Sequence, residues 1–153
     1  MRLVWAAMLA LAQPAFAQSV APEDARAVRA VIEAQLDAFK RDDAARAFSF
    51  ASPGIRSMFD TPVNFMQMVR SQYAVVYRPA SVTFGEARVL EGQLTQMVVF
   101  TDAQAQRWLA LYPMERQPDG SWRIDGCILE RAEARRGPAA SRSSAATHAS
   151  ANR

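Results

Sequence analysis

The hydrophobic pattern of this chain changes its period once, at Arg78-Pro79, and that change decides most of the fold. Before it, the apolar residues of segment 22–40 recur every three or four positions, which is typical of an amphipathic helix. After it, from Ser81 onward, apolar and polar residues alternate, which is typical of strands. Helices and strands that are segregated along the chain in this way predict an α+β fold.

Four helices are predicted in the first half, and their starts are marked by capping side chains and prolines. Ser52-Pro53 and Thr61-Pro62 each place a hydroxyl that can cap a helix before a proline that suits the first helical position. Asp43 is expected to cap the second helix at its junction with the first. The predicted helices cover residues 22–40, 43–50, 53–59 and 62–73.

Four strands are predicted in the second half, with two irregularities that bend them. The apolar positions change phase at Gly85-Glu86, which predicts a β-bulge there, and Gly126 predicts a second bulge. Segment 117–120 has the composition of a tight turn, and Pro113 is expected at a bulge or beyond the end of its neighbour strand. Strands at 81–89, 94–101, 107–116 and 122–129 are therefore expected to form a four-stranded antiparallel sheet, strongly curved around the first helix as a cone with an apolar interior.

The first seventeen residues have the pattern of a secretory signal peptide. Arg2 precedes an apolar segment, 3–12, and a small-residue site follows at 15–17. Cleavage is therefore expected between Ala17 and Gln18, and the mature protein is expected to be periplasmic or secreted. A membrane anchor is the alternative, but the apolar segment is shorter than the roughly 20 residues that a spanning helix needs.

The other end of the chain, residues 132–153, is rich in Ala, Ser and Arg and lacks an apolar period, which predicts a disordered tail. Residues 18–131 remain as a single domain. The net charge of +3 comes from the tail, whereas residues 18–131 are close to neutral. A nucleic-acid-binding domain normally carries its own positive excess, so no nucleic-acid partner is expected. Weak contact of the basic tail with anionic surfaces stays open.

Several chemistries are excluded by what residues 18–131 lack. They contain no histidine, because His148 is in the tail, and one cysteine, Cys127. A Ser-His-Asp triad, a Cys-His pair and a histidine-based metal site are therefore excluded, as is a disulfide within the domain. The segment also lacks a glycine-rich phosphate loop. We expect no cofactor and no metal, and we assign no catalytic residue.

Three segments, VIEAQLDAFKRDDAARAFSFASPGIRSMF, YRPASVTFG and YPMERQPDGSWRIDGC, resemble a bacterial family known as domain of unknown function 4864. The resemblance extends over about residues 27–131. That family looks like a member of the nuclear-transport-factor-2-like superfamily of α+β cones, which includes ketosteroid isomerase, small dehydratases, polyketide cyclases and proteins without known activity. The resemblance implies the cone fold and brings no catalytic residues, because a fold does not fix a function.

Five polar side chains are candidates for ligand binding. Tyr73 and Tyr77 lie near the predicted entry to the sheet, and Tyr112 is expected to point into the cone. Their hydroxyls could hydrogen-bond a ligand, or they could be core aromatics with a polar tip at the rim. Arg56 and Arg78 could hold an anionic ligand by bidentate contacts, with structural salt bridges as the favoured alternative.

Two carboxylates and one thiol complete the reactive side chains of interest. Asp125 or Glu115 could act as a general base if buried, because desolvation raises the pKa of a carboxyl group. Strand parity predicts instead that both face outwards, as cross-strand partners of Arg123 and Arg116. For Cys127 we expect a free, buried and inert thiol, with an intermolecular disulfide or a redox role as the alternative.

These observations favour a secreted or periplasmic module without catalytic activity. It would bind a small apolar or amphipathic ligand in its cone, or another protein, including a second copy through the sheet face. The alternative is an isomerase- or dehydratase-like enzyme that pairs a tyrosine with an Asp or Glu in the cone pocket. A cavity of about 300 Å³ or more with convergent polar groups would favour ligand binding. The side chains expected to fill the core or to line such a pocket include Met58, Met66, Met68, Met97 and Met114.

Overall fold

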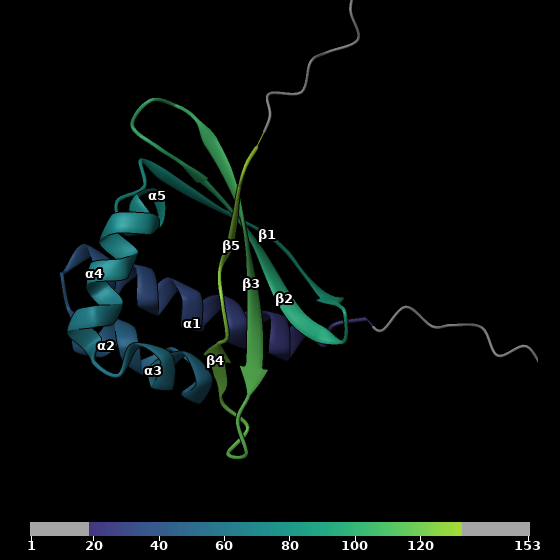
Figure 1. Cartoon of the computed structure of the whole chain (residues 1–153). Coiled ribbons are helices and arrows are strands. Elements are labelled where there is room, and N and C mark those ends of the chain that lie inside the picture. Colours follow the sequence, from purple (N-terminus) through teal and green to yellow (C-terminus); the bar gives the residue numbers. More distant parts are fainter. Residues whose placement is uncertain (1–18, 133–153) are drawn as a thin grey trace, which may run out of the picture.

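Helices precede strands in the part of the chain that the structure describes, residues 19–132 (Figure 1). The structure is a computed structural model. The helices are α1 (Pro22–Lys40), α2 (Ala44–Ser49), α3 (Pro53–Phe59), α4 (Pro62–Gln72) and α5 (Ala74–Tyr77). The strands are β1 (Ser81–Leu90), β2 (Gln93–Thr101), β3 (Arg107–Arg116), β4 (Trp122–Ile124) and β5 (Ile128–Arg131). This order confirms the predicted α+β fold. The predicted signal peptide and nearly all of the predicted tail lie outside the described residues.

The caps predicted from the sequence explain where α2, α3 and α4 begin, whereas α1 begins at Pro22 without a side-chain cap. The side chains of Ser52 and Thr61 accept hydrogen bonds from backbone N–H groups of α3 and α4, and Asp43 accepts one from the first turn of α2. Each such cap stabilises a helix by about 1 kcal/mol. The sequence did not predict α5, whose first turn has no side-chain cap.

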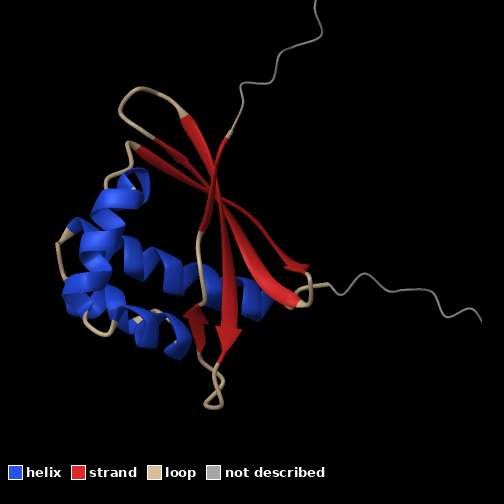
Figure 2. Ribbon diagram, in the orientation of Figure 1, coloured by secondary structure: helices blue, strands red, loops and turns tan. Residues whose placement is uncertain are grey.

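The sheet is antiparallel, with the order β1-β2-β3-β4, and β5 also pairs with β3 (Figure 2). A bulge lies where Gly126 predicted one, but it interrupts the predicted last strand, 122–129, and divides it into β4 and β5. Ile124 lies opposite Met114 and Ile128 opposite Leu111, so residues 125–127 face only two residues of β3. One of these two is Pro113, which lacks the N–H that a regular ladder would use.

The first predicted bulge also lies where the phase change placed it. Phe84 pairs with Val98 and Ala87 with Gln96, so Gly85 and Glu86 together face one residue of β2. A Cβ atom on Gly85 would come within 3.3 Å of the Met97 Cβ atom, which is tighter than ordinary van der Waals contact. The extra residue keeps both Phe84 and Ala87 against the core.

The core lies between the helices and one face of the sheet (Figure 2). It is built from α1 residues such as Ile32 and Phe39 and from sheet residues such as Val98, Phe100 and Met114, all of which are buried. The opposite face presents partly exposed apolar side chains at Met97, Val99, Leu109 and Leu111. Figure 2 shows the described helices on one side of an open, twisted sheet, and a cone-like curvature stays a prediction. Among residues 19–132, none of the helices combines the length and apolar character that a membrane crossing requires.

Candidate ligand-binding cavity

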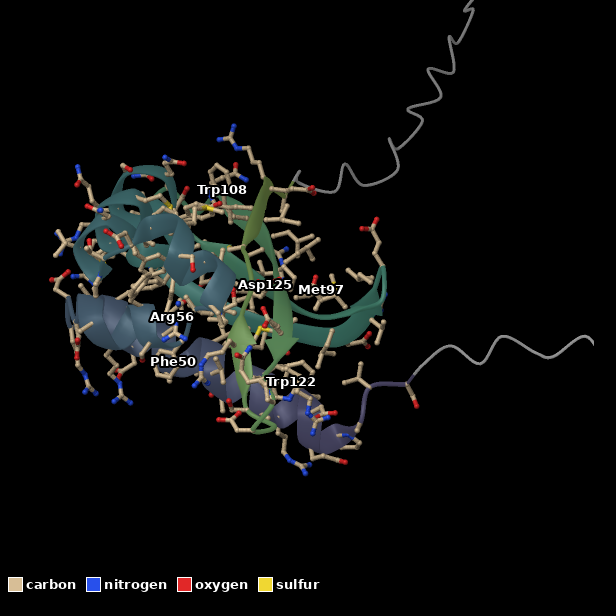
Figure 3. The ribbon with its side chains drawn as sticks, turned by 60° about the horizontal axis from the view of Figure 1, so that its bottom comes forward. Phe50, Arg56, Met97, Trp108, Trp122 and Asp125 are labelled. Atoms are coloured by element: carbon tan, nitrogen blue, oxygen red, sulfur yellow. The ribbon has the colours of Figure 1, made fainter. Side chains whose placement is uncertain are left out.

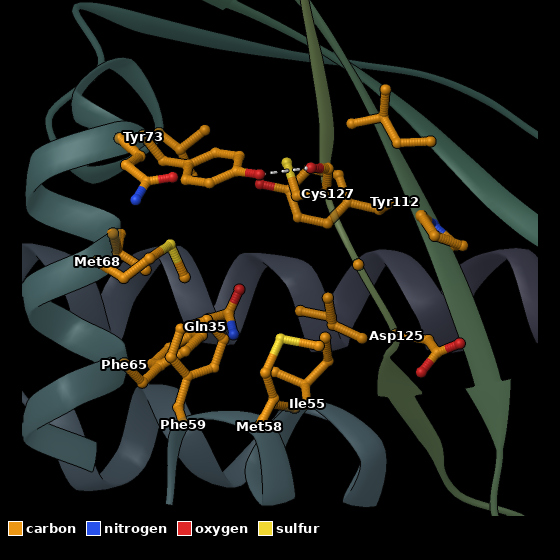
Figure 4. Close-up of a pocket in the computed structure, with 18 of the residues that line it drawn as sticks. Gln35, Ile55, Met58, Phe59, Phe65, Met68, Tyr73, Tyr112, Asp125 and Cys127 are labelled. Carbon is orange, nitrogen blue, oxygen red and sulfur yellow. Dashed lines mark hydrogen bonds between the residues drawn. The ribbon is translucent and has the colours of Figure 1, made fainter. Parts of the chain in front are cut away.

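A cavity of about 600 Å³ lies between the helices and the sheet, bordered by α1, α3, α4, β3 and the segment that joins β4 to β5 (Figure 4). Its volume lies within the range of roughly 300–1,000 Å³ that is typical of ligand pockets. Most of its wall is apolar. The apolar side chains that line it include Phe39, Ile55, Met58, Phe59, Phe65, Met68, Val69, Val76, Ile124 and Ile128.

Helix α3 forms one wall of this cavity and marks its mouth. Ile55, Met58 and Phe59 of α3 all belong to the lining, yet no residue of α3 is buried. The Met58 and Ile128 side chains are 71% and 54% exposed. Exposed lining residues lie where a cavity meets solvent, so the mouth opens between α3 and the start of β5. An apolar rim of this kind favours entry of apolar molecules.

Tyr112 places a polar atom deep in the apolar wall. It lies on β3 between the buried residues Ala110 and Met114, and only 1% of it is exposed. Its hydroxyl has no hydrogen-bond partner among the described residues. Burial raises the pKa of Tyr112 well above its usual 10, so the phenol is neutral and keeps its hydrogen. Buried hydroxyls are normally paired, which makes this atom the exceptional feature of the cavity.

Tyr73 reaches the same end of the cavity from the end of α4. Its hydroxyl donates a hydrogen bond to the backbone carbonyl oxygen of Cys127 at 3.0 Å. Burial, and to a smaller extent Cys127, raises the pKa of Tyr73. Figure 4 shows the hydroxyls of Tyr73 and Tyr112 close to the sulfur of Cys127. The two tyrosines and the thiol therefore form one polar end in a largely apolar space.

The Cys127 thiol is held at this end by the bulge between β4 and β5. The residue is half-buried and unpaired. Burial raises the pKa of the thiol to about 12, and the nearby Tyr112 hydroxyl, whose contact with the sulfur falls short of a hydrogen bond in geometry, lowers it by less. The thiol is therefore protonated at neutral pH and is a poor nucleophile, because the thiolate is the reactive form.

Asp125 belongs to the cavity lining, but its carboxylate is engaged elsewhere. One carboxylate oxygen accepts from Ser52 Oγ at 2.7 Å and the other from Gln93 Nε2 at 3.0 Å. In Figure 4 the carboxylate points away from the two tyrosine hydroxyls. The prediction that Asp125 faces outwards as the cross-strand partner of an arginine was wrong, because its carboxylate bonds Ser52 and Gln93. Glu115 does face Arg123 across the ladder.

Gln35 supplies a further polar group from α1. It is 3% exposed, and its side-chain nitrogen donates to the Ala47 carbonyl oxygen at 3.1 Å. Its amide oxygen faces the open space in Figure 4. Nothing in the sequence singles out Gln35 as a cavity residue, since it lies on the buried stripe of α1, where an apolar residue is the usual occupant.

Three of the five predicted ligand-binding residues lie outside this cavity. Tyr77 and Arg78, with Asp42 and Arg70, form the Asp42 cluster on the surface. The Tyr77 hydroxyl donates to the Asp42 carboxylate, and Arg70 and Arg78 bind the same group at 2.9 and 3.0 Å. Arg56 is exposed and is absent from the lining (Figure 3). The structure thus brings Tyr73 and Tyr112 together and separates them from the other three.

Sequence reasoning missed most of the apolar wall. Ile55 and Phe59 stand four residues apart on α3, which was a usable signal for one apolar helix face. The helix is too short for that signal to show which side it covers. Within residues 19–132 no three His, Cys, Asp or Glu side chains gather in a way that could hold a metal ion.

Fold and cavity define an α+β protein with a mainly apolar ligand-sized cavity between its helices and its sheet. The chain belongs to the family described as Domain of unknown function (DUF4864), whose family model matches residues 21–137. No curated protein and no solved structure matches the chain. The wider kinship with the nuclear-transport-factor-2-like superfamily stays a prediction.

Proposed function

We propose that this protein binds a small, mainly apolar molecule in the cavity and does not act on it chemically. The observation that carries the proposal is the hydroxyl of Tyr112, which is buried in the cavity wall and has no hydrogen-bond partner within residues 19–132. A buried polar group without a partner destabilises a fold by about 1–3 kcal/mol. A ligand that supplies the missing partner would remove this cost, which gives the cavity a preference for being occupied.

The shape of the site supports the same proposal. The cavity volume of about 600 Å³ is much larger than the volume that a single buried water molecule requires. The exposed rim at Met58 and Ile128 offers an apolar entry. Ligand sites are typically lined by apolar and aromatic side chains, with a few polar groups that fix orientation. Here Tyr73, Tyr112 and Gln35 are those groups.

An isomerase- or dehydratase-like reaction, the alternative, has weaker support. It needs a carboxylate that meets a tyrosine inside the pocket. Among the described residues, the carboxylate that hydrogen-bonds a tyrosine hydroxyl is that of Asp42, which is exposed and outside the cavity. Asp125 is hydrogen-bonded to Ser52 and Gln93. We therefore favour binding without chemistry.

The expected setting of this function rests on the sequence alone. Residues 1–17 predict export to the periplasm or beyond. A binding module there would encounter molecules that are present outside the cytoplasm. A homodimer through the sheet face and weak contact of the basic tail with anionic surfaces also stay predictions.

The test is native mass spectrometry of the chain purified without denaturant. We expect an additional mass on the native protein that disappears after denaturation. Ile55→Trp should abolish the additional mass, because Ile55 lines the cavity and the larger indole would fill it. Ser57→Trp is the matched control, because this residue lies on the same helix but is exposed and absent from the lining.

The outcomes separate cleanly. Loss of the added mass in Ile55→Trp together with its retention in Ser57→Trp supports the cavity as the site. Equal loss in both variants would assign the effect to α3 as a whole. If the wild-type protein carries no added mass and also fails to bind apolar probes, ligand binding is contradicted.

A further inference from the structure

Resting on the proposed binding function, the geometry points to a narrower class of ligand: an uncharged, mainly apolar molecule whose neutral oxygen accepts a hydrogen bond from the Tyr112 hydroxyl. The oxygen belongs to a carbonyl or a hydroxyl group. The rest of the molecule lies against the apolar side chains that lead from Tyr112 to the mouth at Met58 and Ile128.

The hydrogen bonds at the polar end indicate that the ligand atom beside Tyr112 must be a hydrogen-bond acceptor. The Tyr73 hydroxyl already donates its hydrogen to the Cys127 carbonyl oxygen at 3.0 Å, so it offers the cavity only lone pairs. The Tyr112 hydroxyl has no partner among the described residues, so its hydrogen is free. A ligand oxygen beside Tyr112 can accept that hydrogen. A hydrocarbon would leave it unpaired.

Negative charge on the ligand has no counterpart in the wall. None of the lining residues, all of which are in the described part of the chain, is Lys, Arg or His. Burying a carboxylate or phosphate without a cation is unfavourable, because the lost hydration is not replaced. The phenol of Tyr112 can donate a hydrogen bond to such a group but supplies no positive charge.

Positive charge is also poorly matched. The carboxylate in the lining belongs to Asp125, and its two oxygens accept from Ser52 and Gln93. It points away from the tyrosine end in Figure 4. A ligand ammonium group beside Tyr112 would therefore be desolvated without a nearby counter-charge. Both signs of charge are disfavoured, and a neutral oxygen remains as the matching head group.

The experiment compares probes that share a decyl-length chain and differ in the head group. Decanol, methyl octyl ketone, decanoate, decylamine and headless decane are titrated calorimetrically into the wild-type chain and into Tyr112→Phe. We expect the alcohol and the ketone to bind the wild type about tenfold more tightly than the variant, as for one lost hydrogen bond. Decane should bind both proteins equally, and the two charged probes should bind the wild type more weakly than decanol.

Tyr77→Phe is the matched control, because Tyr77 lies outside the lining and should not affect any of the affinities. If the neutral probes bind the wild type and Tyr112→Phe equally, or if decanoate or decylamine binds most tightly, the assigned ligand class is wrong while binding in the cavity stands. If no probe binds, decane included, the proposed binding function itself is contradicted. The two failures are therefore distinguishable.

Discussion

The Asp42 cluster and the cavity wall at Tyr112 each contain a tyrosine hydroxyl, but the two hydroxyls differ in whether they have hydrogen-bond partners. On the surface, the Tyr77 hydroxyl and two arginines all converge on one carboxylate. Arg78 also lies over the Tyr77 ring, 4.2 Å from its centre. In the cavity, the Tyr112 hydroxyl is buried and has no partner in the described part of the chain.

This difference indicates which of the two regions has a polar group available for a ligand. A cluster in which every charge already has a partner has little left to offer a ligand, and it ties α1 to α4 and α5. An unpaired group in an apolar wall destabilises the empty protein but is available to a ligand. All three tyrosines were candidates in the sequence, and it did not distinguish Tyr73, which reaches the cavity, from Tyr77, which joins the Asp42 cluster.

The largest effect in this comparison is expected at Ser52, a buried polar residue beside the cavity whose hydrogen-bonding capacity is used twice. Its Oγ accepts from the Ile55 N–H at 3.2 Å and donates to Asp125 at 2.7 Å. Ser52→Ala removes a helix cap and one donor to a carboxylate, so we expect the free energy of unfolding to fall by about 2 kcal/mol. Urea denaturation measures this change.

Thr61→Ala is the matched control for Ser52→Ala. Thr61 caps α4 in the same way, accepting from the Asn64 N–H at 3.2 Å, and within residues 19–132 its hydroxyl donates to no carboxylate. Removing this cap should lower the free energy of unfolding by about 1 kcal/mol. Equal losses in the two variants would show that the bond to Asp125 contributes nothing.

The next largest effect is expected at Tyr73, the paired tyrosine of the cavity. Tyr73→Phe removes the hydrogen bond to the Cys127 carbonyl oxygen, so unfolding free energy should fall by about 1 kcal/mol. Amide hydrogen exchange of residues 125–129 should become faster, because that bond holds the bulge against α4. A variant as stable as the wild type would mean that the cavity end is not held by this contact.

The starts of α2, α3 and α4 and the positions of both bulges were predictable because local chemistry determines them. Proline with a capping hydroxyl defines the start of α3 and α4, and the phase change at Gly85-Glu86 required one extra residue. The division of the last strand into β4 and β5 was harder to predict from the sequence. Gly126 signalled a bulge, but not that the ladder would be interrupted over three residues.

The site was predictable only in part, because its residues come together through long-range packing. Tyr112 was placed inside by its parity on β3, while Tyr77 and Arg78 follow Tyr73 closely in sequence and yet point to the surface. The short helix α5 causes this separation, and nothing local predicted it. Met66 and Met114 fill the core, whereas Met58 and Met68 line the cavity and Met97 lies on the outer sheet face.

A smaller effect, confined to acid, is expected in the Asp42 cluster. The hydrogen bond from Tyr77, and then that from Arg70, lowers the pKa of Asp42 below its usual 3.8. A group whose pKa is lower in the folded state stabilises it above the unfolded-state pKa, and that contribution is lost as the pH falls through the folded-state pKa. Asp42→Asn should therefore reduce the loss of stability between about pH 5 and about pH 2.

Asparagine suits this test because it tolerates the positive φ of 57° found at Asp42. The measurement is thermal unfolding at a series of pH values, and the two curves should converge in acid. At neutral pH the difference should be smaller than that of Tyr73→Phe, because exposed ion pairs are strongly screened. Parallel curves over the whole range would show that the cluster does not contribute to acid sensitivity.

The smallest change, and the most informative, is expected for Tyr112→Phe in the empty protein. The variant keeps the ring, whose centre lies 6.4 Å from that of Phe100, and removes a buried hydroxyl that has no partner among the residues that the structure describes. Its unfolding free energy in urea should therefore equal or slightly exceed that of the wild type. A loss of about 1 kcal/mol or more would mean that the hydroxyl is paired after all.

A saturating neutral ligand should reverse the order of stability of the wild type and Tyr112→Phe, because binding stabilises the form that holds the ligand more tightly. That reversal is the signature that a merely structural tyrosine cannot produce.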